Sequence, residues 1–255
     1  MRYRLSTIRA LTRRTINELI RTPTGAVPGI LAPTIFMLGL SAVFSAAANI
    51  RGFGDVNGFR TFIVPVSILQ GAGFTGAATG VNLARDIEQG WFDRLLVCPA
   101  PRVTLLAGIV SSAALRALLP ASFVFVVALI MGVHWPGVDG LAIAFVLAMG
   151  LATVMAFWST IIALRFRTQQ AAPLMQVANF IAVLFTTSYA PKELLASWLR
   201  TIASINPVTH VLDGARQGFV GSVTWHTTWQ AAVSILGMQL VLGALAVRSL
   251  RRFGV

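Results

Sequence analysis

The sequence predicts an all-α integral membrane protein with six transmembrane helices, and three observations support this fold class. Of the 255 residues, 56% are hydrophobic and only 11% are charged, whereas soluble domains carry about a quarter charged residues. The mean hydropathy is +0.78. Six apolar stretches also approach the roughly 20 residues that a helix needs to cross a bilayer core. We expect residues 1–255 to form one transmembrane domain.

An amphipathic helix is predicted at residues 2–22, before the first span. Apolar residues recur there at helical spacing, arginines occupy the positions between them, and Thr22-Pro23 supplies a stop signal. Such a helix lies in the inner leaflet interface with its arginines on anionic lipid, although a solvated basic helix would show the same pattern. The next apolar run is too long for a signal-peptide core, so we interpret it as a retained span.

The six spans are predicted to be α-helical, because an unpaired backbone amide in hydrocarbon costs several kcal/mol. A membrane barrel would instead show two-residue alternation, which these segments lack. The predicted spans are residues 25–48, 61–83, 111–133, 141–164, 171–189 and 228–247.

The distribution of basic residues predicts the orientation. With the N-terminus inside, fourteen basic residues fall on the cytoplasmic side and five outside, and Arg116 falls within the third apolar segment. Positive charge accumulates in cytoplasmic loops, so both termini are expected in the cytoplasm of a plasma-membrane protein. Arg116 is expected near the cytoplasmic end of its span, where it would snorkel or pair with the connection at 84–99.

Two connections differ from short loops. Residues 84–99 form a charged cytoplasmic connection with an apolar side that includes Ile87 and Trp91. This composition predicts a short helix with a face for a partner protein, since Trp and Arg are favoured interface anchors, and an interfacial helix held by lipid is the alternative. Residues 190–227 predict two short helices that re-enter the outer leaflet, because tryptophans and short apolar runs prefer the interface.

Uncharged polar and aromatic side chains within the spans are candidates for a substrate pathway. The candidates are Phe36, Met37, Gln70, Phe74, Asn179 and Phe180. Helix packing and interhelical hydrogen bonding are the simpler roles for such residues. Gly76 and Gly80 form a Gly-x-x-x-Gly pair that predicts close helix packing, with a dimer seam as one location.

The sequence argues against several other classes of protein. It contains no metal-ligand spacing of histidines and acids, no Gly-x-Ser-x-Gly element and one cysteine, Cys98. Stacking aromatics interleaved with basic residues are absent, which argues against nucleic-acid binding. The only lysine, Lys192, follows no phosphate-loop glycine pattern. All eight acids fall in predicted loops or at interfaces. An ion-coupled carrier would instead place at least one acid inside the membrane, so this class is not favoured.

The connection at 84–99 resembles the first intracellular loop of ABC-2 type transporter permeases, a family that includes daunorubicin-resistance-type drug exporters and lipid or polysaccharide exporters. That loop usually reads Arg-Glu, Gly-Thr, an acid, a Leu pair and Pro. This chain has Arg85-Asp86, Gly90, Asp93, Leu95-Leu96 and Pro99, and departs by Asp86 for Glu and Trp91 for Thr. The segment from Asn206-Pro207 to Arg216 is similar to the family's Asn-Pro element before the last span.

The resemblance implies a permease subunit without catalytic residues of its own. It implies that 84–99 acts as a coupling helix that docks on a separate ABC ATPase subunit, which binds ATP and Mg²⁺. The residues implied in this contact are Arg85, Asp86, Glu88, Gly90, Trp91, Asp93, Arg94 and Leu95. It further implies pairing with a second permease, identical or paralogous, and export of an amphipathic drug or lipid. An ion-coupled efflux carrier, a membrane scaffold and an intramembrane enzyme are the alternatives.

Overall fold

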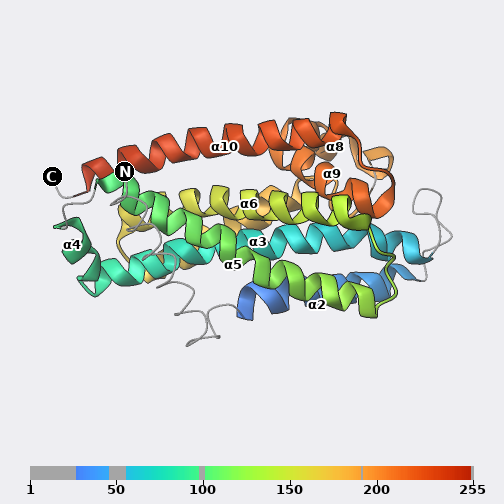
Figure 1. Ribbon diagram of the computed structural model, residues 1–255, viewed down its shortest axis with the longest axis horizontal. Helices are drawn as coiled ribbons and strands as arrows, with labels where there is room; N and C mark the ends of the chain where they lie inside the picture. The colour runs from blue at the N-terminus through green and yellow to red at the C-terminus, as the bar shows by residue number, and fades with distance from the viewer. Residues whose placement is uncertain (1–26, 46–55, 98–100, 191, 254–255) are drawn as a thin grey trace.

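The computed structural model describes residues 27–45, 56–97, 101–190 and 192–253 (Figure 1). Every regular element in these ranges is helical, which confirms the predicted all-α class. The predicted interfacial helix at 2–22 lies outside the described residues.

Four of the described helices are long and apolar enough to cross a membrane. They are α3 (Val56–Glu88), α5 (Arg102–Ile130), α6 (Gly137–Phe166) and α10 (Trp225–Arg252). A shorter apolar helix, α2 (Val27–Ser45), precedes them. These five helices overlap the predicted spans at 25–48, 61–83, 111–133, 141–164 and 228–247, and they confirm a multi-pass membrane protein. The count of six spans stays a prediction.

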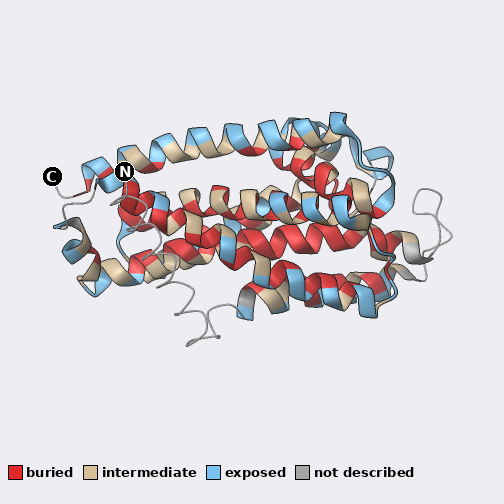
Figure 2. Ribbon diagram, viewed as in Figure 1, coloured by how far each residue is buried: buried red, intermediate tan, exposed pale blue. Residues whose placement is uncertain are grey.

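The helices form an elongated bundle around α3 (Figure 1). Helix α3 contacts α2, α5 and α6 along its length, and 78% of its most apolar window is buried, against 17% for α10. Figure 2 shows this difference as a buried central helix and an exposed outer face on α10. At one end of the bundle lie α4 (Trp91–Leu96) and the end of α10, and at the other end lie α8 (Ser197–Ile205) and α9 (Pro207–Val220).

The glycine pair of α3 packs against α6 of the same chain. The Ser159 hydroxyl on α6 donates to the Gly76 carbonyl oxygen and accepts from the Gly80 amide, with both heavy-atom distances 3.1 Å. A Cβ at either glycine would meet α6 atoms. The pair therefore serves close packing inside one chain, and the alternative location at a dimer seam is not its place in this fold.

The predicted span at 171–189 is shorter in the structure. A 3-10 turn (Gln169–Ala171) leads into α7 (Ala172–Leu184), which has 13 residues and is therefore about 20 Å long. The hydroxyls of Thr186 and Ser188 donate to the Val183 carbonyl at 2.7 and 2.6 Å. Such side-chain bonds compete with helical ones, so the helix ends before the apolar stretch does.

The segment at 190–227 contains the two predicted short helices, α8 and α9, after a 3-10 turn at Lys192–Leu194. On α8, Trp198, Ile202 and Ile205 recur at helical spacing and are exposed. Re-entry of this segment into the bilayer stays a prediction.

Arg116 occupies a buried position that differs from the interfacial one predicted. Because α5 begins at Arg102, nine residues before the predicted start, Arg116 lies well inside the helix. Its side chain is buried, and its Nη2 donates to the Thr79 hydroxyl of α3 at 2.6 Å. The expectation that Arg116 snorkels to the cytoplasmic interface is therefore wrong.

Candidate functional site

The connection predicted as one helix at 84–99 is divided by a turn. Helix α3 continues to Glu88, Gly90 adopts a left-handed conformation with φ 68°, and α4 begins at Trp91. Glycine suits this position because left-handed backbone costs other residues about 1–2 kcal/mol. The amides of Gln89 and Gly90 bond to the carbonyls of Arg85 and Ile87, so the turn is closed by backbone hydrogen bonds and α4 projects from the end of α3.

Two of the residues implied in partner binding, Arg85 and Glu88, make side-chain hydrogen bonds within the chain and are exposed. The Glu88 carboxylate accepts from the Thr168 hydroxyl at 2.7 Å, from the Gln169 amide at 3.0 Å and from Gln169 Nε2 at 2.6 Å. Arg85 Nε donates to Gln169 Oε1 at 3.2 Å. These bonds hold the connection between α6 and α7 against the end of α3, just before α4 begins.

Helix α4 has a buried side and an exposed side. Phe92 is 1% exposed, and Leu95 packs partly buried against the same apolar cluster. Asp93 and Arg94 are exposed, and Trp91 is half-buried. The sequence pattern did not single out Phe92, although a large apolar residue beside charged ones is the signal that identifies an anchor. The exposed side of α4 thus presents an acid and a base at the end of the bundle, beside the half-buried Trp91.

The pathway candidates fall into two groups. Asn179 Nδ2 on α7 donates to the Gln70 carbonyl of α3 at 3.2 Å, and both side chains are buried. Gln70 Nε2 and Asn179 Oδ1 have no hydrogen-bond partner within the part of the chain that the structure describes. Phe36 of α2 lies near Phe180, with ring centroids 6.3 Å apart. These four residues join α2, α3 and α7 around the middle of α3.

The other two pathway candidates are Met37 of α2 and Phe74 of α3. Met37 is fully buried in the main apolar core, which matches the packing role that the sequence left open. Phe74 is half-buried on α3. When every face of a helix is apolar, the sequence has no periodic pattern that shows which side chains face the core.

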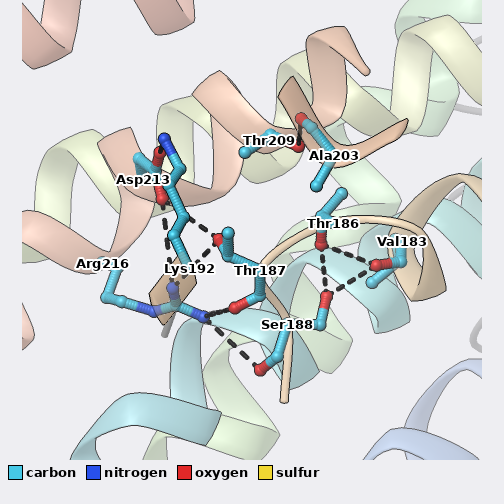
Figure 3. A network of polar contacts seen from close by, with 9 residues as sticks. All are labelled: Val183, Thr186, Thr187, Ser188, Lys192, Ala203, Thr209, Asp213 and Arg216. Atoms are coloured by element: carbon cyan, nitrogen blue, oxygen red, sulfur yellow. Dashed lines mark hydrogen bonds and ion pairs between the residues drawn. The ribbon is translucent and has the colours of Figure 1, made fainter. Parts of the chain in front are cut away.

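A polar network at the opposite end of the bundle was not predicted (Figure 3). Arg216 of α9 is buried, and its Nη2 donates to the Thr187 carbonyl at 3.0 Å. Asp213 lies 3.9 Å from both Arg216 Nη1 and Lys192 Nζ. The guanidinium also stacks 3.6 Å from the Phe62 ring centroid. The spacing of Asp213 and Arg216, one helical turn apart, is the only signal of this network in the sequence.

Asn206 of the Asn-Pro element joins two helices. Its Oδ1 accepts from the Val208 amide at 3.0 Å and caps α9, and its Nδ2 donates to the carbonyls of Ala182 and Phe185 at 2.8 and 3.0 Å. An asparagine can do both because its amide is a donor and an acceptor. Pro207 follows at the first helical position, where a missing amide hydrogen has no cost.

Comparison with known proteins gives a consistent group of relatives. The family model described as ABC-2 type transporter matches residues 6–220. The chain is 26% identical to ycf38 of Cyanophora paradoxa, assigned by name as a transport permease, over 88% of this chain and 76% of the relative. It is 21% identical to the daunorubicin resistance ABC transporter permease protein DrrB1 of Streptomyces coeruleorubidus, over 90% and 80% of the two chains. It is 27% identical to YbhR of Escherichia coli K12, named a probable multidrug ABC transporter permease, over 76% and 53%.

Proposed function

Because the chain belongs to the ABC-2 type transporter family, we propose that it is the membrane subunit of an ATP-driven exporter. In this proposal it moves an amphipathic molecule, a drug or a lipid, outward across the plasma membrane. Relatives named for daunorubicin resistance and multidrug transport support this class of substrate. The orientation proposed is the one that the arginine distribution predicts, with α4 at the cytoplasmic end.

The observation that carries the proposal is the exposed side of α4. Trp91, Asp93 and Arg94 lie on a short helix at one end of the bundle, and Phe92 anchors that helix to the body from the other side. A protein that docks on this surface can therefore transmit force to the transmembrane helices through α4 and α3. We assign the docked protein as an ABC ATPase subunit.

The energy source follows from what the sequence contains. It has no Gly-x-x-x-x-Gly-Lys phosphate loop, so ATP and Mg²⁺ are proposed to bind to the ATPase partner. Two permeases, identical or paralogous, would then face two ATPase subunits. We place the pathway beside Gln70, Asn179, Phe36 and Phe180, where two buried amide groups have hydrogen-bonding atoms unused by the described residues and where Phe36 lies near Phe180.

The test is co-purification of the chain with a candidate ATPase subunit. We expect Trp91→Ala to weaken the complex by about 2 kcal/mol, which is ~30-fold in Kd, because tryptophans at the centre of an interface are typical hot spots. Asp93→Arg should weaken it further by reversing a charge on the same surface. Trp225→Ala is the matched control, since Trp225 is exposed at the opposite end of the bundle.

Two results would contradict the proposal. Unchanged binding by both α4 variants would remove α4 as the docking surface. Daunorubicin efflux that persists without any ATPase but stops when the proton gradient is dissipated would indicate an ion-coupled carrier instead.

A further inference from the structure

Phe253 lies where the end of α10 contacts α4, the end of α6 and the start of α5. Phe253 directly follows α10 and is buried, and its ring packs edge-on against Phe92 of α4 with centroids 5.4 Å apart. The guanidinium carbon of Arg167, which ends α6, lies 4.4 Å from the centroid of the Phe253 ring. An edge-on aromatic pair and a cation over a ring are both attractive arrangements, because the ring has a negative face and a positive edge.

Arg102, the first residue of α5, fixes the end of α10. Its Nη1 donates to the carbonyls of Leu250, Arg251 and Phe253 at 3.2, 3.3 and 3.2 Å. The last four carbonyls of a helix have no partner within the helix, and they form the negative end of its dipole. A guanidinium at this place satisfies several carbonyls at once, so the end of α10 is attached to the start of α5 by charge and by hydrogen bonds.

Helix α4 depends on these contacts for its orientation. It has six residues, and an isolated helix of this length is unstable in water because nucleation is costly. The left-handed Gly90 precedes it, so packing must set its direction. Phe92 supplies that packing, and apolar side chains that include Leu105, Leu106 and Leu250 surround its ring.

We infer that Phe253 and Arg102 are positioning residues that link the coupling helix α4 to α10. Through them a movement of α4 is passed to α10 as well as to α3, and α10 packs at its other end against α9, the helix that carries Arg216. The inference rests on the proposed function, because it gives α4 the role of receiving the ATPase movement.

The experiment uses the complete complex with its ATPase subunit in liposomes. Spin labels are placed at Val97→Cys, just after α4, and at Leu245→Cys on α10, both exposed positions, in a Cys98→Ser background. We expect a narrow distance distribution between the labels that Phe253→Ala broadens. The same variant should lower ATP hydrolysis by the assembled complex at least threefold while the ATPase still co-purifies. Phe253→Leu should restore most of both signals, since it keeps an apolar contact with Phe92.

The matched control is Phe166→Ala, which removes an exposed phenylalanine at the same end of the bundle and should change neither signal. The inference is overturned if Phe253→Ala gives the distance distribution and hydrolysis rate of this control. If Phe253→Ala does not accumulate in the membrane, Arg102→Gln tests the same link, with a broadened distribution again expected. The co-purification test distinguishes failure of the proposed function from failure of this inference. If the proposed function is wrong, Trp91→Ala leaves ATPase binding unchanged.

Discussion

Gly76 and Gly80 show at the scale of single residues how closely the central helices approach. A Cβ at Gly76 would overlap the Ala152 carbonyl oxygen, and a Cβ at Gly80 would overlap Ser159. The neighbouring atoms are mostly backbone, which cannot move aside as a flexible side chain could. The absence of a side chain at these two positions is thus a condition for the contact between α3 and α6.

We predict that Gly76→Ala lowers stability by about 1–3 kcal/mol, the usual cost of overpacking a dense core. Thermal unfolding in detergent measures the effect. Gly237→Ala on α10 is the control, since a Cβ there meets nothing within 4 Å, and it should be neutral or stabilising by about 0.5–1 kcal/mol because alanine favours the helix. Equal midpoints for the two variants would contradict the packing described.

At the scale of the element, one side chain joins the end of α7 to the start of α9. Asn206 accepts from the start of α9 and donates to two carbonyls near the end of α7. The end of α7 and the start of α9 therefore both depend on the Asn206 amide. A carboxylate at this position could accept the hydrogen bond from α9, but it could not donate to the carbonyls of α7.

We predict that Asn206→Ala destabilises the protein by about 1–2 kcal/mol, the usual cost of a lost helix cap. Asn206→Asp should not restore stability, because its carboxylate would cap α9 but would face the carbonyls of Ala182 and Phe185 without a proton to donate. Thermal midpoints and amide exchange at the end of α7 distinguish the two effects. Full recovery in the Asp variant would show that only the α9 cap matters.

At the scale of the whole molecule, charged networks tie the helices together at both ends of the bundle. At the α4 end, Arg102 donates hydrogen bonds to the end of α10, and Arg167 lies over the Phe253 ring. At the other end, Arg216 connects α9 to the segment after α7 and to Phe62 of α3. The apolar middle is packed by α3, α5 and α6, so loss of either end network should loosen that end first.

We predict that Arg216→Lys loosens the outer end despite keeping the charge. A lysine lacks the planar group that stacks on Phe62 and reaches the Thr187 carbonyl, and a buried carbonyl that loses its donor costs about 1–3 kcal/mol. Limited proteolysis between α7 and α9 should become several-fold faster. Arg200→Lys is the control, because Arg200 is exposed on α8. Equal cleavage rates in both variants would contradict the role given to Arg216.

Much of the fold could be predicted because hydropathy is a local property. Five apolar helices overlap predicted spans, and α8 and α9 were both expected. The candidate site was predicted only in part. The sequence singled out the segment at 85–96 as a candidate site. The orientations of the Arg85 and Glu88 side chains could not be predicted, because they depend on hydrogen bonds to Gln169, which is more than 80 residues away. The role of Phe92 as an anchor was likewise not predictable, because its ring packs against Phe253, which is distant in the sequence.

The sequence alone determined that this protein is a multi-helix membrane protein and which segment carries a charged short helix, because about 20 consecutive apolar residues suffice to specify a membrane-spanning helix. The tertiary structure decided where α7 ends, that Arg116 and Arg216 are buried, and which side of α4 is exposed. These features depend on hydrogen bonds and ring contacts between residues that are distant in the chain. A local sequence pattern does not show which distant residues will meet, so it cannot predict these contacts.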